Sequence, residues 1–155
     1  MNPSLTMNLC PGSSVGAIIK NTKNEFLCLY RLKHPRGLAF IAGHIDLEDN
    51  GPTHALVREV KEESGLTVLE SALILNKVFL NTCSRLRPSD NLTYDGHEWF
   101  VYDVTLYKGR AKLMEPTKHK FVKWMSAEEI HDYILREDCD PAWFQMILPM
   151  IALMK

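Results

Sequence analysis

The sequence lacks a long apolar run and an excess of charge of either sign, and each shortage excludes a class of protein. Eighteen Lys and Arg residues against nineteen Asp and Glu residues give a formal net charge of −1, so no overall field favours nucleic acid or an anionic membrane. The apolar tail over residues 141–155 is interrupted by Pro149 and is shorter than the ~20 residues that cross a bilayer. We therefore predict no nucleic-acid or membrane partner. We expect the tail to dock as a helix, either on its own domain or on a second copy in a homodimer.

Cysteine is also scarce. Its four positions are too far apart for a Cys-x-x-Cys metal site, and their scatter does not resemble a disulfide framework; they are Cys10, Cys28, Cys83 and Cys139. We interpret them as reduced, mostly structural thiols. The residues up to Ser14 contain no basic segment followed by an apolar run, so no secretory signal is visible and a cytoplasmic location is expected.

The length bounds the number of domains. A chain of 155 residues with 46% hydrophobic content can bury one sizeable core and is too short for two ordinary domains. We predict a flexible tail over residues 1–13 and a single domain over residues 14–155.

The most informative stretch covers residues 58–66 and reads Arg-Glu-Val-Lys-Glu-Glu-Ser-Gly-Leu. In a helix of about 3.6 residues per turn, Glu59, Glu62 and Glu63 stand at positions i, i+3 and i+4 and share one face. Like charges at these spacings repel, so this face is either solvated or placed against a cation. Mg²⁺ suits the second interpretation, because it takes oxygen ligands from carboxylates, substrate phosphates and water. Gly65 stands where a left-handed residue commonly ends a helix.

This run resembles the second half of the signature of the Nudix hydrolases, Arg-Glu-x-x-Glu-Glu-x-Gly-aliphatic. In the first half of that signature, counting back from Arg58 places Asn50 where the family has a glutamate. The preceding loop therefore looks one residue longer than the family's pattern, and either Glu48 or Asp49 could supply the missing carboxylate. Gly43 precedes this loop, and a residue without a side chain lets a backbone carbonyl approach the same cation.

The resemblance implies an α/β/α sandwich with a mixed β-sheet and a hydrolase that cleaves the phosphoanhydride bond of a nucleoside diphosphate linked to another group. It implies Mg²⁺ or Mn²⁺ held by Glu59, Glu62, Glu63 and the backbone at the glycine loop. Arg58 would hold one of the glutamates in position. The proton of the attacking water would pass to one of these carboxylates or to Glu98, which stands at the head of a predicted strand and could equally be a solvated rim carboxylate.

The rest of the chain reads mainly as strands separated by turns. Two strands at 15–19 and 26–30 are predicted to form a hairpin, and a third at 38–41 leads into the glycine loop. Apolar and β-branched residues predict one or two strands within 66–80 and further strands at 97–106 and 121–124. Ser126 begins a helix with the serine–glutamate spacing of a capping box.

Four further side chains are candidate substrate contacts. Arg31, at the end of the second strand, could meet a substrate phosphate, and Arg85 and Arg87 could clamp one from the turn-rich insertion over residues 81–96. Tyr94 could stack on a nucleobase. The alternative for each is a solvated or core side chain.

Residues outside the Nudix signature indicate which substrate subgroup the chain resembles. The chain has no proline around Asn81, as the ADP-ribose subgroup has, and no tyrosine slightly further on, as the dinucleoside polyphosphate subgroup has. With its Glu115-Pro116 segment, it looks most like the MutT-type enzymes that convert a nucleoside triphosphate to a monophosphate and pyrophosphate. The alternatives are an ADP-ribose or nucleotide-sugar pyrophosphatase, a non-catalytic nucleotide-binding module and a scaffold that retains the fold.

Overall fold

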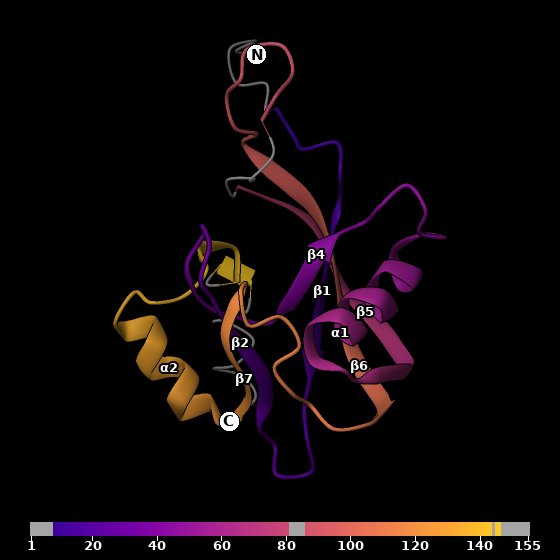
Figure 1. Cartoon of the computed structure of the whole chain (residues 1–155), viewed down its shortest axis with the longest axis vertical. Helices are drawn as coiled ribbons and strands as arrows, with labels where there is room; N and C mark the ends of the chain where they lie inside the picture. Colours follow the sequence, from indigo (N-terminus) through magenta and orange to yellow (C-terminus); the bar gives the residue numbers. More distant parts are fainter. Residues whose placement is uncertain (1–7, 81–85, 144, 147–155) are drawn as a thin grey trace.

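Two β-sheets lie between helices α1 and α2 in the structure, a computed structural model that describes residues 8–80, 86–143, 145 and 146 (Figure 1). In chain order the elements are β1 (Ser14–Ile19), β2 (Phe26–Arg31), β3 (Gly37–Ala39), β4 (Ile41–His44), α1 (Pro52–Ser64), β5 (Thr67–Leu80), β6 (Gly96–Lys108), β7 (His119–Met125) and α2 (Ala127–Leu135). The arrangement confirms the predicted α/β fold with a mixed sheet.

The larger sheet has the strand order β4-β1-β6-β5 and is mixed. Strand β1 runs antiparallel to β4 and parallel to β6, and β5 runs antiparallel to β6. The smaller sheet, in the order β3-β2-β7, is antiparallel. The predicted hairpin between 15–19 and 26–30 is wrong, because β1 and β2 belong to different sheets and only an isolated bridge joins Lys20 to Phe26. Both edges of β1 are already occupied by β4 and β6, which leaves no edge for β2.

The predicted strand over residues 38–41 is divided between the two sheets. Its first part, in β3, pairs with β2, and its second part, in β4, pairs with β1. This short crossing segment therefore joins the sheets, and β4 then delivers Gly43 to the side of α1. By contrast, the region over residues 66–80 forms one long strand, β5.

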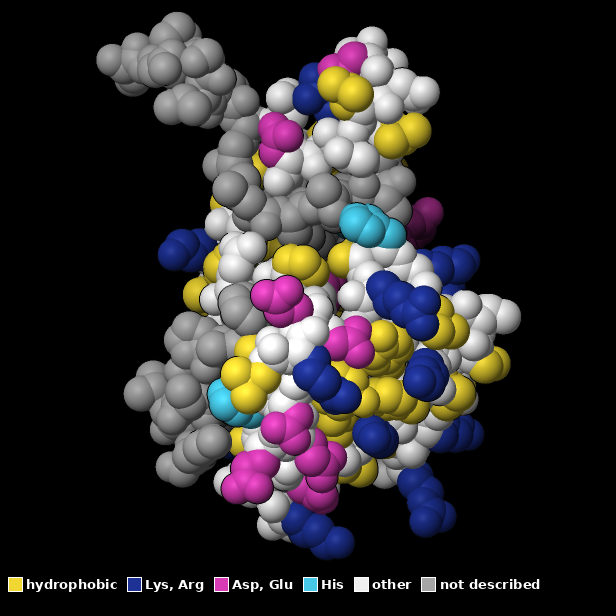
Figure 2. Space-filling view, turned by 90° about the vertical axis from the view of Figure 1, so that its left-hand side faces the viewer, with side chains coloured by type: hydrophobic (Ala, Val, Ile, Leu, Met, Phe, Trp, Pro, Cys, Tyr) yellow, Lys and Arg dark blue, Asp and Glu magenta, His cyan; other side chains and the backbone are white. Residues whose placement is uncertain are grey.

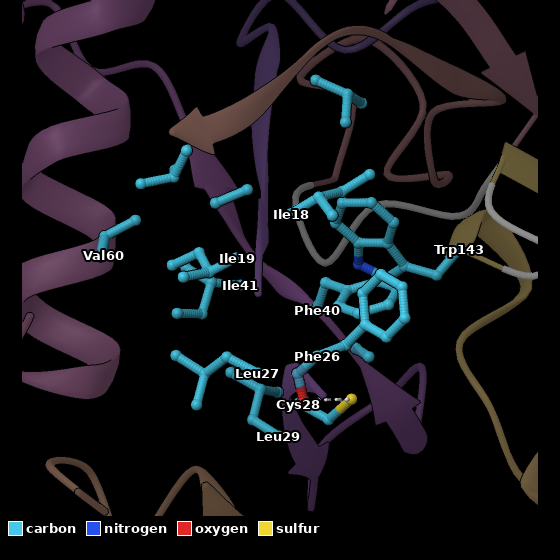
Figure 3. Packing of buried hydrophobic residues seen from close by; sticks show 14 of the residues in the cluster. Ile18, Ile19, Phe26, Leu27, Cys28, Leu29, Phe40, Ile41, Val60 and Trp143 are labelled. Atoms are coloured by element: carbon cyan, nitrogen blue, oxygen red, sulfur yellow. Dashed lines mark hydrogen bonds between the residues drawn. The ribbon is translucent and has the colours of Figure 1, made fainter. Parts of the chain in front are cut away.

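Helix α1 packs its apolar side on the larger sheet. Leu56 and Val60 are fully buried, and Val60 lies beside Ile19 and Ile41 in the core (Figure 3). The helix ends where Gly65 adopts the left-handed conformation, with φ 80°, as the sequence predicted. This packing fixes the rotation of α1 and leaves its glutamates on the side near β4.

The side of the core away from α1 is aromatic. Trp143 makes edge contacts with Phe40 and Trp99, with ring centroids 5.4 Å apart in each pair. A Cβ atom at Gly16 would overlap the Trp143 ring. The described part of the C-terminal tail thus docks on its own domain, and residues 147–155 lie outside the described residues.

The expected flexible tail over residues 1–13 is described from residue 8 onward. Leu9 forms a parallel bridge with Gly96, and the Cys10 N–H donates to the Gly96 carbonyl at 2.9 Å. Cys10 is buried. These residues therefore lie along the beginning of β6.

Helix α2 begins with the predicted cap. The side chain of Ser126 accepts a hydrogen bond from the Glu129 N–H at 3.1 Å.

The surface carries both acidic and basic side chains on the face that Figure 2 shows. Within the described ranges, every helix is too short or too polar to cross a membrane.

Candidate active site

The three predicted glutamates of α1 differ in how far they reach into the protein. The side chain of Glu62 is 51% exposed, that of Glu59 is 13% exposed, and Glu63 is a buried residue. The i, i+3 and i+4 spacing therefore produces two inward carboxylates and one at the rim. A small cation between them could contact protein on one side and a solvated substrate on the other.

The glycine loop lies directly against the two inward carboxylates. A Cβ atom at Gly43 would overlap the carboxyl group of Glu59, so only glycine lets this carboxylate rest on the backbone of β4. A backbone hydrogen bond from Ala42 reaches Glu63. The strand and the helix thus bring backbone and carboxylate oxygens to one place.

Burial makes the charged forms of these two glutamates costly. It raises the pKa of Glu59 to about 7, against the opposing effect of Arg58. It also raises the pKa of Glu63 well above its usual value, with the negative charges of Glu59 and Glu115 adding to the effect. The Oε2 atom of Glu63 is buried and has no hydrogen-bond partner among the described residues. A hard divalent cation fits this donor set, because it would supply both the missing partner and the compensating charge.

Arg58 connects α1 to the preceding loop. Its guanidinium donates to both carboxylate oxygens of Asp49, at 2.9 and 2.7 Å, to the His44 carbonyl at 3.0 Å and to Glu59 Oε1 at 2.9 Å. The Asp49 side chain is 2% exposed, whereas Glu48 is exposed. Asp49, rather than Glu48, therefore fills the loop-carboxylate position, and the extra residue is accommodated in the loop.

We predict that acid weakens this clamp. Hydrogen bonding to Arg58 lowers the pKa of Asp49 to about 2, below the ~3.9 of an unfolded aspartate. Because the folded-state pKa is the lower one, the pair stabilises the protein above about pH 4, and that contribution is lost as the pH falls through about 2. In urea titrations, Asp49→Asn should lower the free energy of unfolding near neutral pH, and the difference should shrink over this interval. The exposed neighbour provides the control, Glu48→Gln, and a pH-independent effect of Asp49→Asn would contradict the ion pair.

Arg31, at the end of β2, lies close enough to Glu63 for its charge to act on that carboxylate. It is held by its own turn, since Nε donates to the Pro35 carbonyl at 2.9 Å and a terminal nitrogen donates to the His34 carbonyl at 3.4 Å. Its positive charge lowers the otherwise raised pKa of Glu63. Arg31 is thus the predicted substrate contact that the structure brings near the glutamates.

The beginning of β7 adds residues that sequence reasoning missed. His119 is buried, its Nδ1 has no hydrogen-bond partner in the part of the chain that the structure describes, and burial lowers its pKa. Glu115 raises the pKa of Glu63, as noted above, and forms an ion pair with Lys118 at 2.9 Å. Of these, only the Glu115-Pro116 segment stood out in the sequence, as a family likeness and not as part of a site.

The remaining predicted site residues have other partners or lie elsewhere. Glu98 accepts hydrogen bonds from Ser13 Oγ at 3.4 Å and from Asn76 Nδ2 at 3.3 Å. Arg87 forms an ion pair with Asp90 in the insertion. Tyr94 is half-buried, and Arg85 lies outside the described residues.

The chain is similar to one known domain family and to several solved structures. Residues 11–144 match the NUDIX domain. Among solved structures, the MutT protein of Methanosarcina mazei Go1 is 23% identical, with a TM-score of 0.67 over 95% of this chain and 96% of that one. A MutT structure from work on Aliivibrio salmonicida and Vibrio cholerae is 21% identical, with a TM-score of 0.65 over 92% and 98%. The NUDIX domain of Shewanella oneidensis NrtR, complexed with ADP ribose, is 14% identical, with a TM-score of 0.58 over 86% and 82%. No curated protein matches the sequence.

Proposed function

The chain belongs to the NUDIX family, whose hydrolases act on nucleoside diphosphate derivatives, and we propose that it converts a nucleoside triphosphate to a monophosphate and pyrophosphate. The observation that carries hydrolysis is the pair of inward glutamates beside the glycine loop, Glu59 against Gly43 and Glu63 bonded by the Ala42 backbone. A scaffold or a simple binding module does not require one buried and one largely buried carboxylate beside a backbone position that only glycine permits. The triphosphate assignment is supported by the lack of other subgroup markers and by the likeness to MutT structures over nearly the whole chain.

We propose that Glu59, Glu62 and Glu63, with the backbone at Gly43, hold Mg²⁺ or Mn²⁺. The family generally uses divalent ions, and such an ion supplies charge neutralisation of the phosphates and a lowered pKa of bound water. Arg58 positions Glu59 and ties α1 to the loop. Because Glu63 is buried and Glu59 largely so, electrostatic interactions on the protein side of the site are stronger than in bulk solvent.

The water proton has two candidate acceptors, a glutamate of α1 or Glu98. Both oxygens of Glu98 already accept hydrogen bonds, from Ser13 and Asn76. Burial raises the pKa of Glu59 to about 7, which supports an α1 glutamate as an acceptor whose pKa is closer to neutrality than that of an exposed carboxylate. We therefore propose that an α1 glutamate accepts the proton and that Glu98 holds the adjoining strand and loop in place.

We expect Arg31→Gln to raise KM more than Arg87→Gln does. The Arg31 side chain is already oriented by two backbone carbonyls and sits within reach of the charge on Glu63, so its bond to a phosphate would need little ordering. Loss of a hydrogen bond to a charged group costs roughly 1.5–3 kcal/mol, or about tenfold or more in KM. Arg87 is the matched control, because its guanidinium is paired within its own loop. A larger rise for Arg87→Gln in steady-state kinetics would assign the phosphate contact to the insertion.

The test of the function is a substrate panel with product identification. Nucleoside triphosphates, oxidised ones included, would be compared with ADP-ribose, nucleotide sugars and dinucleoside polyphosphates, in Mg²⁺ and in a chelator. We expect the highest kcat/KM for a triphosphate, release of pyrophosphate, and no turnover in the chelator. A tenfold preference for ADP-ribose, about 1.4 kcal/mol in transition-state binding, would refute the substrate assignment and leave hydrolysis standing. Binding of these compounds without cleavage of any would instead identify a nucleotide-binding module.

A further inference from the structure

Three side chains with nitrogen and sulfur donors converge outside the carboxylate site. Cys10 Sγ lies 3.8 Å from His44 Nε2, and His44 Nε2 lies 3.3 Å from His97 Nε2. All three residues offer a ligand atom within 4.8 Å of the others. Cys10 and His97 are buried, and His44 is half-buried.

The fold, and not the sequence spacing, makes this cluster. Cys10 comes from the segment that pairs with Gly96, His97 follows in β6, and His44 ends β4 on the other side of β1. Neighbouring residues of a strand point to opposite faces of the sheet. Because Gly43 faces Glu59 and α1, His44 faces the opposite side, where the His97 ring also contacts Trp99 with centroids 6.4 Å apart.

We propose that Cys10, His44 and His97 form a zinc-binding site distinct from the carboxylate site. Zinc bonds of about 2.0–2.1 Å to nitrogen and about 2.3 Å to sulfur, arranged tetrahedrally, place two nitrogens about 3.4 Å apart and a nitrogen and a sulfur about 3.6 Å apart. The observed separations are 3.3 Å and 3.8 Å. The ligand atoms are therefore spaced for one ion to bind without a large movement of the chain.

The donor chemistry favours zinc over the ion of the carboxylate site. Thiolate and imidazole are the ligands that Zn²⁺ prefers, whereas Mg²⁺ takes oxygen ligands. Binding requires the Cys10 thiolate and the Nε2 lone pairs of both imidazoles, so each ring would carry its proton on Nδ1. Three protein ligands leave a fourth tetrahedral position for water or another donor.

A cavity next to the cluster would give an ion access to it, and an ion bound there would also have a structural role. The residues that follow Cys10 and His44 line a cavity of about 400 Å³; its lining residues are Pro11, Gly12, Ile45, Asp46, Leu47 and Glu48. An ion bound to Cys10, His44 and His97 would cross-link the N-terminal segment, β4 and β6, three parts of the chain far apart in sequence. Because the unfolded chain holds no such preformed site, binding would stabilise the folded state.

Cobalt absorption tests the site, because Co²⁺ bound to a thiolate gives an intense near-ultraviolet charge-transfer band. We expect the purified protein to show this band with Co²⁺ and to lose it on titration with Zn²⁺, which yields the zinc affinity. Cys10→Ser should abolish the band. Loss of an outer-sphere partner costs about 10–100-fold in metal affinity, so loss of a direct ligand in Cys10→Ser or His44→Gln should cost at least about 100-fold.

Two controls locate the ion. Cys28→Ser removes another buried thiol and should keep the band, and Glu63→Gln alters the carboxylate site and should keep it too. Thermal unfolding with Zn²⁺ should show a rise in Tm that Cys10→Ser and His44→Gln both remove. Absence of the band in the unaltered protein, its persistence in Cys10→Ser, or its loss in Glu63→Gln would overturn the proposal.

Discussion

Replacement of Glu63 by glutamine is expected to reduce the rate of metal-dependent hydrolysis by at least about 10³-fold. A bound metal ion contributes several kcal/mol of transition-state stabilisation, and each 1.36 kcal/mol corresponds to a factor of ten in rate. Glutamine preserves the shape of the side chain but removes the anionic oxygen that lacks a protein partner. Both kcat and the apparent affinity for Mg²⁺ should fall. Steady-state rates measured over a range of Mg²⁺ concentrations would separate the two effects.

The same substitution should not destabilise the protein in the absence of metal. Burial and the charge of Glu59 disfavour the ionised form of Glu63, and an amide cannot ionise, so it does not carry this cost. We expect Tm in a chelator at neutral pH to be unchanged or higher. Glu62→Gln should lower the rate as well, and the exposed Glu70 provides the control, because Glu70→Gln should leave both rate and Tm unchanged. Wild-type kcat/KM in Glu63→Gln would refute the assignment of Glu63 as a metal ligand.

Gly43→Ala is expected to lower kcat/KM by about 100-fold or more. The added methyl group would occupy the position of the Glu59 carboxyl group, which is the flexible end of its side chain. Glu59 would therefore move away from the site and the strand would stay, and a displacement of about 1 Å at a reacting centre can cost 10²-fold in rate. The loss should appear in kcat at saturating Mg²⁺.

A second glycine separates loss of activity from loss of stability. At Gly16 the added methyl group would meet the ring of Trp143, which is buried between other aromatic rings and cannot move aside as a carboxylate can. Gly16→Ala should therefore lower the free energy of unfolding by about 1–3 kcal/mol, as overpacking of a core does, with little change in activity per folded molecule. If Gly43→Ala instead lowered the free energy of unfolding in urea titrations and kept its activity, the contact between Glu59 and Gly43 would not be required for catalysis.

Local sequence patterns predicted the helix and its carboxylate face well. Helical periodicity placed Glu59, Glu62 and Glu63 together, and Gly65 ends the helix in the left-handed conformation that its position suggested. These features depend on residues within a few positions of one another. The choice between Glu48 and Asp49 was different, because both are acidic and adjacent, and only the folded loop determines which one Arg58 reaches.

Long-range pairing explains what the sequence could not predict. The strands at 15–19 and 26–30 looked like a hairpin, yet β1 is flanked by β4 and β6, which lie far away in the chain. The cluster of Cys10, His44 and His97 spans similar separations, and no spacing rule connects them. His119 gave no local signal either, since its position beside Arg31 depends on how β7 pairs with β2.

The contact between Arg58 and Asp49 shows how this loop accommodates an extra residue. An arginine side chain pairs with any carboxylate that lies at the right distance and in the right direction. A carboxylate shifted by one position in the sequence can therefore replace the usual one if the loop backbone turns to bring it there. In this loop, the Asp46 N–H donates to Asp49 Oδ2 at 2.8 Å and closes that turn. A consensus with fixed intervals would reject this loop, whereas a criterion of an acidic residue within reach of the arginine would retain it.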